Sequence, residues 1–161
     1  QAFDNSSGGQ IWVEDDRFGP LSNHLLHTSF GKGWMSMMMI QEVGETVQAA
    51  IVKLPFDFST GIMRGRVNPH DGQVYATGLQ GWNGGGRFGL DDGGVQRLRY
   101  TGTPLNPVPG EPGSSRLRLN LPTLGPVDQL QLQLRIQADD GEAFEEEVYW
   151  TIHVVPSSDP R

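Results

Sequence analysis

Hydrophobic and polar residues follow one another in short runs along this chain, and apolar stripes with the period of a helix are hard to find. The apolar runs have the length of strands and recur about every 8 to 12 residues, separated by turns rich in glycine, asparagine and aspartate. This pattern predicts an all-β fold. The expected strands in the first two thirds are residues 10–13, 25–30, 34–43, 47–54, 63–68, 73–77 and 95–100.

Two of the turns predict hairpins. Gly44 and Glu45 separate two long apolar runs, and the glycine supplies the positive φ of a tight reversal. Since both runs are mostly apolar, we expect this hairpin to be covered on both faces. The second turn, residues 69–72, ends in Asp71-Gly72, a pair that favours tight reversal.

Composition changes after residue 103. Prolines and glycines concentrate in residues 104–113 and predict a stiff linker. Beyond it, apolar and polar residues alternate, as expected for antiparallel strands with one buried face. The expected strands here are residues 117–121, 130–136 and 144–155. We therefore expect a division into residues 1–103 and residues 104–161, the second part being a linker and a small antiparallel β module.

Charge and composition narrow the function classes. The formal net charge of -7 argues against broad binding of nucleic acid or anionic membranes, because no basic field would gather a polyanion. The chain contains 22 glycines and 11 prolines, which suits a turn-rich β protein better than a helical one. With no cysteine, disulfides and thiolate metal sites are excluded. No apolar run is long enough for a membrane-spanning segment.

Four segments resemble a known family: DNSSGGQIWV, GPLSNHLLHTSFGKGW, MRGRVNPHDGQVYATGLQGW and DGGVQRLRYTG. They are similar to the last blades of bacterial six-bladed propellers related to pyrroloquinoline-quinone (PQQ)-dependent sugar dehydrogenases, as found in planctomycete-like bacteria. The tail from LPTLGPVDQLQLQLRIQ to YWTIH looks like the small β module that follows those propellers. The resemblance implies propeller-blade-like sheets in residues 1–103, about two blades, then a small sandwich-like module. It also implies a secreted or periplasmic bacterial protein.

Arg64 and Arg66 are the main candidate site. Their i, i+2 spacing places both guanidinium groups on one face of a strand, while Gly65 leaves the opposite face bare for close approach of a neighbouring strand. In the sugar dehydrogenases, an Arg-x-Arg pair in a similar segment contacts the carboxylates of the quinone, so the resemblance implies cofactor binding here. A guanidinium fork suits that task. The alternative is ion pairing of both arginines with carboxylates of a neighbouring strand or blade.

Trp82 is a second candidate for cofactor binding. It lies beside a glycine-rich loop, where its ring is a candidate to stack on a quinone or sugar plane. Capping of a blade is the alternative, and the sequence does not choose between the two.

Two function hypotheses follow. In the first, the chain is a C-terminal fragment or subunit of a secreted quinoprotein dehydrogenase-like propeller. Two blades do not close a propeller, and the family's catalytic histidine and calcium ligands lie in earlier blades, so we expect no catalysis by the isolated chain. PQQ would bind only the complete propeller, and the partners would be the remaining blades or other subunits. In the second, the chain is a noncatalytic extracellular binding or assembly module that uses exposed β edges to hold other chains or carbohydrate.

Other motifs have plainer interpretations. Residues 84–89 match GxGxxG formally, but no helix is expected after them, so we predict a loop rather than a dinucleotide site. Asn83, Asp91 and Asp92 carry oxygen ligands suited to calcium, without the spacing of a known calcium loop. We therefore expect solvated turn residues there.

Two pairs of basic residues are expected to be structural. His24 and His27 are three apart and would face opposite sides of a strand, which disfavours a shared metal. Arg97 and Arg99 repeat the i, i+2 spacing, and we expect them to pair with Asp91 or with Asp92.

Overall fold

The computed structural model describes residues 3–4, 6–79, 93–102, 121, 123–137 and 141–155. Within these ranges the chain is all-β and its sheets are antiparallel, which confirms the expected fold class at that level. No helix in these ranges is long and apolar enough to cross a membrane. The elements are β1 (Ser7–Trp12), the 3-10 helix η1 (Asp16–Leu21), β2 (Leu25–Ser29), β3 (Trp34–Val43), β4 (Thr46–Asp57), β5 (Gly61–Val67), β6 (Val74–Leu79), β7 (Gly94–Leu98), β8 (Val127–Gln137) and β9 (Ala143–Ile152).

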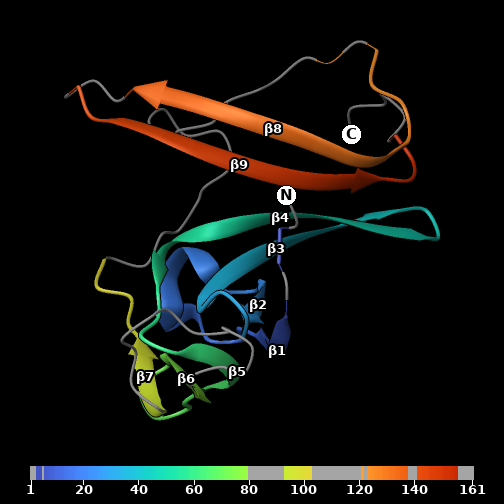
Figure 1. Ribbon diagram of the computed structural model, residues 1–161. Helices are drawn as coiled ribbons and strands as arrows, with labels where there is room; N and C mark the ends of the chain where they lie inside the picture. The colour runs from blue at the N-terminus through green and yellow to red at the C-terminus, as the bar shows by residue number, and fades with distance from the viewer. Residues whose placement is uncertain are drawn as a thin grey trace.

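The strands form two sheets (Figure 1). The main sheet has six strands in the order β1-β2-β3-β4-β9-β8, and the small sheet has three in the order β5-β6-β7. The small sheet lies at the β1 and β2 end of the molecule, whereas the β8–β9 hairpin lies on the other side of β4. Every strand expected from the sequence within the described ranges is present. The expected strand 117–121 and the linker at 104–113 lie outside the described residues.

The core lies between the small sheet and the β1 to β4 part of the main sheet. Phe18 of η1 is inserted into this core, where it is 1% exposed. Burying one such side chain contributes about 1.5–3 kcal/mol. The core cluster consists of Ile11, Val13, Phe18, Leu26, Met35, Leu54, Phe58, Ile62, Val74 and Ala76.

Glycines allow β1 to lie directly against β5. A methyl group at Gly8 would overlap the carbonyl oxygen of Ile62, and it would lie 2.5 Å from Thr28 Oγ1. On the facing strand, a methyl group at Gly65 would overlap the end of the Ile11 side chain. The expectation that Gly65 permits close approach of a neighbouring strand is therefore confirmed.

The hairpin of β3 and β4 forms as expected, with Gly44 at φ 60° in its turn. The expectation that this hairpin is covered on both faces is wrong. Ile40 is 46% exposed and Val47 is 61% exposed, because this end of the hairpin extends past the core, which reaches only the other end of β3 and β4. The apolar run of β3 is thus buried only near Met35 and Ser36.

The C-terminal hairpin is joined to the rest of the main sheet through β4. Strand β9 pairs with β8 along most of its length but with β4 through three residue pairs, Ala50 to Val52 against Val148 to Trp150. The main sheet therefore continues across the boundary expected near residue 104. The division into residues 1–103 and 104–161 stays a prediction.

We expect Gly8→Ala to lower the free energy of unfolding by about 1–3 kcal/mol, because the added methyl group meets backbone that cannot rotate away. Urea denaturation measures this value. Gly94→Ala in β7 is the matched control: a methyl group there meets nothing within 4 Å. Its unfolding free energy is expected to stay within about 1 kcal/mol of the original chain. Equal losses in the two variants would contradict close β1–β5 packing.

Candidate functional site

The outer face of the small sheet gathers arginines from two strands. Across the sheet, Arg66 lies opposite Tyr75, and Tyr75 lies opposite Arg97. In the adjacent row on the same face, Arg64 lies opposite Thr77. All three arginines are exposed, whereas the residues that alternate with them on β5 and β6, such as Gly65 and Ala76, are buried. We call Arg64, Arg66, Tyr75, Thr77 and Arg97 the arginine face.

Neither Arg64 nor Arg66 is paired with a carboxylate in the part of the chain that the structure describes. Nη1 of Arg64 donates to the carbonyl oxygen of Met63 at 2.7 Å, and Nη1 of Arg66 donates to that of Gly65 at 2.8 Å. Each contact uses a single donor of the five on a guanidinium group. With respect to the described residues, both arginines therefore keep most of their hydrogen-bonding capacity unused.

Arg97 has a carboxylate neighbour on the same face. Its Nη1 lies 3.9 Å from Oδ2 of Asp71, and the hydroxyl of Tyr75 donates to that oxygen at 2.8 Å. The pKa of Asp71 is held below its usual value, first by the backbone N–H of Gln73, then by Tyr75 and Arg97. The expected partners Asp91 and Asp92 lie outside the described residues. So do Trp82, Asn83 and the loop at 84–89.

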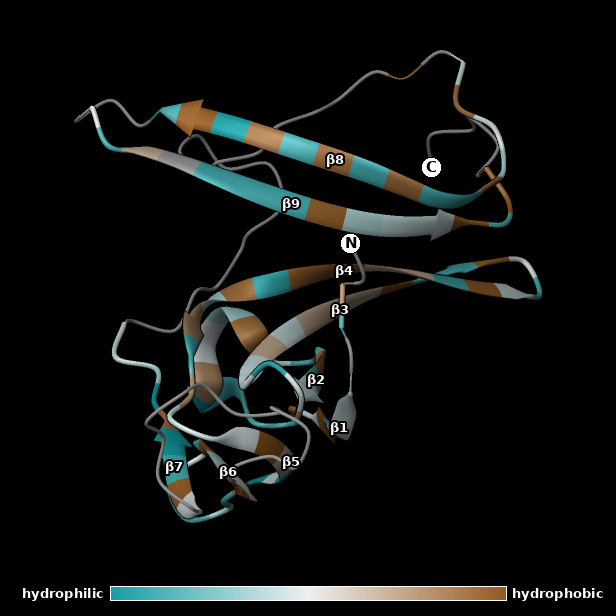
Figure 2. Cartoon of the chain, in the orientation of Figure 1, coloured by the Kyte–Doolittle hydropathy of each residue, from teal (hydrophilic) through white to brown (hydrophobic). Residues whose placement is uncertain are grey.

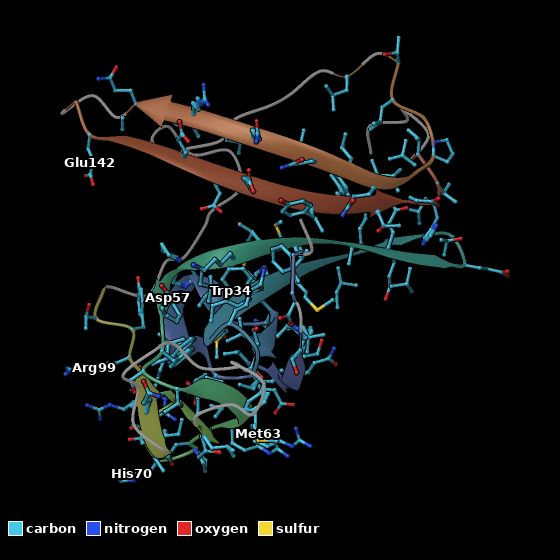
Figure 3. The ribbon with its side chains drawn as sticks, in the orientation of Figure 1. Trp34, Asp57, Met63, His70, Arg99 and Glu142 are labelled. Atoms are coloured by element: carbon cyan, nitrogen blue, oxygen red, sulfur yellow. The ribbon has the colours of Figure 1, made fainter. Side chains whose placement is uncertain are left out.

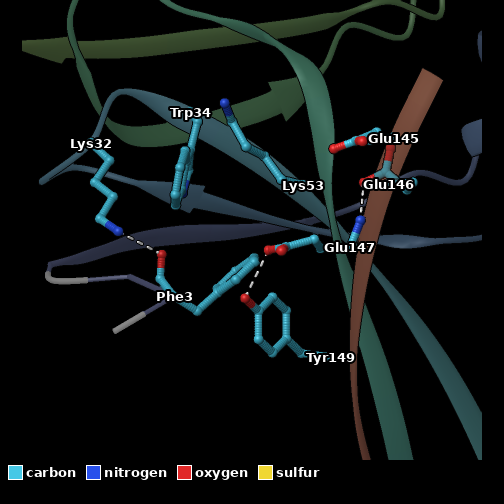
Figure 4. Close-up of a pocket in the computed structure, with 8 residues that line it drawn as sticks. All are labelled: Phe3, Lys32, Trp34, Lys53, Glu145, Glu146, Glu147 and Tyr149. Carbon is cyan, nitrogen blue, oxygen red and sulfur yellow. Dashed lines mark hydrogen bonds between the residues drawn. The ribbon is translucent and has the colours of Figure 1, made fainter. Parts of the chain in front are cut away.

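Where β9 diverges from β4, a second candidate site opens. Pro55 lies in β4 beyond the last β4–β9 pair and has no backbone N–H to donate, which suits a strand edge that has stopped pairing. The wedge pocket there encloses about 370 Å³. Trp34 lies at its base, beside Asp57 of β4 (Figure 3). The lining residues are Phe3, Lys32, Trp34, Lys53, Glu145, Glu146, Glu147 and Tyr149, drawn in Figure 4.

In the wedge pocket, the Trp34 ring is contacted by two lysines of the pocket itself. Nζ of Lys32 and Nζ of Lys53 each lie 4.6 Å from the Trp34 ring centroid, and Figure 4 shows the ring between them. Lys32 also donates to the carbonyl oxygen of Phe3 at 2.9 Å, and Lys53 lies 3.1 Å from Asp57. These contacts leave little room for a ring to stack on the indole.

The acidic side is likewise engaged. Glu147 accepts hydrogen bonds from Gln131, from Gln133 at 2.9 Å and from the hydroxyl of Tyr149 at 2.9 Å. These contacts lower the pKa of Glu147, with Gln133 first, and the Glu147 carboxylate raises the pKa of Tyr149. The lysines and Glu147 of the wedge pocket therefore have partners within the described chain, whereas Nε1 of Trp34 is buried there without a hydrogen-bond partner.

Among the described residues, the histidines form neither a metal site nor a catalytic triad. His27 and Ser29 both contact the carboxylate of Asp4, at 3.1 Å and 2.6 Å, so the carboxylate stands between serine and histidine. A catalytic triad needs the histidine in the middle. His24 contacts the carbonyl oxygen of Ser22. Within the described residues, no group of three metal-ligating side chains occurs.

Arg17 fixes the turn beside the arginine face. Its guanidinium group donates to Asp15 through Nε and Nη2, at 2.9 and 2.6 Å, and to the carbonyl oxygens of Pro69 and His70, both at 2.9 Å. Gly72 allows this contact. Its φ is +69°, which favours glycine, and a methyl group at this position would lie only 2.6 Å from Oδ1 of Asp15. The β5–β6 turn is thereby attached to the start of η1.

Comparison of the chain with protein-family models, with curated protein sequences and with solved structures finds no match. The resemblance to propellers of the sugar dehydrogenase type therefore stays a prediction. The same holds for the assignment of Arg64, Arg66 and Trp82 to a quinone site.

Sequence reasoning found the arginine pair on β5 and missed its neighbours across the sheet. The alternation of Arg97 with Leu98 indicated a strand face, but only the register of β6 with β7 places Arg97 in one row with Arg66. No local signal predicted the wedge pocket. It depends on where the pairing of β4 with β9 stops.

Asp15→Asn is expected to show how the Arg17 contact depends on pH. The Arg17 side chain, first among the causes, lowers the pKa of Asp15 from 3.8 to about 2. A carboxylate with a lowered pKa stabilises the fold above its unfolded-state pKa, and this contribution is lost as pH falls toward about 2. The difference in unfolding free energy between the original chain and Asp15→Asn should therefore shrink between about pH 4 and pH 2.

Urea denaturation across this pH range measures that difference. Asparagine keeps an oxygen for the N–H of Arg17, so the variant removes mainly the charge. In an Arg17→Met background, Asp15→Asn should lose most of its pH-dependent effect, since only the backbone N–H of residue 17 still donates to Asp15. A difference that persists undiminished at pH 2 would contradict the assignment.

Proposed function

We propose that this chain is a noncatalytic assembly module, and that it pairs with a second copy of itself through the outer edge of β8. The observation that carries the proposal is the position of this strand. In the described part of the chain, β8 ends the main sheet, with β9 as its one neighbour. An edge strand presents a row of unpaired N–H and C=O groups to any other strand.

Strand β8 carries few of the features that usually protect an edge, and its register with β9 is irregular only at its start, between Val127 and Leu130. It has 11 residues, none of them proline or glycine, and runs as VDQLQLQLRIQ. Protected edges are short, bulged, proline-containing or rich in charge. In β8 the two charged residues, Asp128 and Arg135, leave the stretch between them neutral. Figure 2 shows this alternation as hydrophilic and hydrophobic bands along the strand.

One face of this edge is apolar and incompletely covered. Leu130, Leu132, Leu134 and Ile136 are half-buried, while the intervening glutamines are exposed. Their neighbours Val148 and Trp150 on β9 share that face and are also half-buried. An added strand would extend the apolar face and reduce its contact with water.

A second copy of this chain is the partner that best fits the alternating leucines and glutamines of β8. The period of two along β8 means that antiparallel pairing with another β8 sets leucine opposite leucine and glutamine opposite glutamine. Such an interface is self-complementary and closes as a dimer with two-fold symmetry. Cross-strand pairs of this kind contribute roughly 0.2–1 kcal/mol each.

The quinoprotein hypothesis stays a prediction beside this one. It requires that β1 to β7 supply propeller blades and that further blades come from elsewhere, and the sheets of the described chain are open. If β8 instead pairs with a strand of another protein, including other blades, the purified chain should stay monomeric in sedimentation velocity.

Leu132→Lys should weaken self-association, because it places a charge in the centre of the apolar face. Sedimentation velocity over a concentration series gives the dissociation constant of the dimer. We expect it to rise at least about tenfold, which corresponds to about 1.4 kcal/mol. Gln133→Lys is the matched control: it adds the same charge one residue away, on the exposed polar face. Its dissociation constant is expected to change by less than about threefold.

Circular dichroism and thermal unfolding check that both variants keep the original fold. A chain that remains monomeric at millimolar concentration would refute self-association. Equal weakening by the two lysines would also contradict it, since the apolar face would then play no part.

A further inference from the structure

We propose that the arginine face of the small sheet binds a linear polysaccharide that carries carboxylates. The face combines Arg64, Arg66 and Arg97 with Tyr75 and Thr77. Asp71 lies at the Arg97 end of the face, where it accepts the Tyr75 hydroxyl and lies 3.9 Å from Arg97, so Arg64 and Arg66 are the principal anion-binding groups. It lies on the small sheet, which is separate from the β8 edge. The proposal is therefore independent of self-association.

The register sets the spacing of the charges. Arg64 and Arg66 are two residues apart on β5, a separation of about 6.5–7 Å along the strand. Arg66 and Arg97 are two strands apart in one row, about 9.5–10 Å across the sheet. Three guanidinium groups on this grid match repeated negative charges better than a single small anion.

The arginine face has more unused hydrogen-bond donors than the wedge pocket, the other charged surface described above. At the wedge pocket, the lysines are committed to Phe3 and Asp57, and Glu147 has three hydrogen-bond donors. Arg64 and Arg66 each commit one nitrogen, to a carbonyl oxygen, and contact no carboxylate of the described chain. Their remaining N–H groups have the fork geometry that binds a carboxylate through two parallel hydrogen bonds.

The backbone beneath the face is held firmly. Gly65 presses against Ile11 from the core side, and Ala76 of β6 is completely buried. The β5–β6 turn is attached to Arg17 by two hydrogen bonds from its guanidinium group. A ligand therefore has only arginine side chains to order, which lowers the entropic cost of binding.

The choice of a polysaccharide rests on charge and shape. The net charge of -7 opposes any polyanion, and it opposes most strongly one with closely spaced charges, such as duplex nucleic acid with a charge about every 1.7 Å of its axis. A local pair of arginines therefore favours a polymer whose carboxylates are farther apart. An acidic peptide gains most where it can pair with a strand edge, and this surface is the face of a sheet. A uronic acid polymer alternates carboxylates with hydroxyl groups, and the surface alternates guanidinium groups with the Thr77 hydroxyl and the ring of Tyr75, whose own hydroxyl is bonded to Asp71.

Affinity electrophoresis with polygalacturonate in the gel tests the proposal. We expect the original chain to be retarded, and less so as salt rises, since exposed charges are screened. Arg66→Ala should weaken the apparent affinity at least about fivefold, because it removes one charge-assisted fork. Arg66→Lys should lose part of that affinity, since the charge stays but the fork is lost. Arg135→Ala is the matched control: it removes an exposed arginine that is paired with Glu145 at 2.8 Å. Because Arg135 lies on β8, the mobility of every variant is divided by its mobility in a gel without polysaccharide, which removes any effect of self-association. On that scale the retardation of Arg135→Ala should be unchanged.

Three further gels decide the chemistry of the partner. Dextran, which is neutral, should cause no retardation; retardation equal to that in polygalacturonate would overturn a role for carboxylates. Polyglutamate or duplex DNA that retards the chain more strongly than polygalacturonate would overturn the polysaccharide assignment. An equal effect of Arg66→Ala and Arg135→Ala would show nonspecific charge attraction and overturn the site. Circular dichroism of Arg66→Ala confirms that the sheet is intact.

Discussion

Strand β4 is the element on which the rest of the structure depends. Its 12 residues pair with β3 on one edge along the hairpin and with β9 on the other edge through three residue pairs. At its end, three residues lead directly into β5 and the small sheet. The N-terminal core and the C-terminal hairpin are therefore both connected through one strand, and Pro55 lies where its second edge stops pairing.

This arrangement separates two surfaces with different chemistry. On one side of β4, glycine contacts between β1 and β5 hold the small sheet close to the core and turn Arg64 and Arg66 outward. On the other side, β9 holds β8 at the end of the main sheet, where its alternating residues meet no further strand of the described chain. The pocket between these regions is lined by charged and aromatic residues that contact one another. We therefore propose binding roles for the two ends of the molecule, which β4 and β9 join.

Local features of this fold were predictable from the sequence, and long-range ones were not. Gly44 and Gly72 both have positive φ at the turns expected from them, and the bare face at Gly65 indicated close packing. Asp15 could have indicated η1, because its side chain accepts the N–H of Arg17 as a helix N-cap, but Gly19 and Pro20 obscured the helix. The pairing of β9 with β4 carries no local signal. Since strand register is set by distant partners, neither the wedge pocket nor the row from Arg66 to Arg97 could be derived.

Amide hydrogen exchange along β8 tests the assembly role most directly. Strand β8 uses one edge to pair with β9, so in a monomer the N–H groups on its other edge are open to water in the described chain. If β8 pairs with a second copy, exchange at residues 130–136 must slow as protein concentration rises, while exchange at β5 and β6 stays constant. Exchange along β8 that is fast at every concentration would contradict the account, because the edge would then remain unpaired.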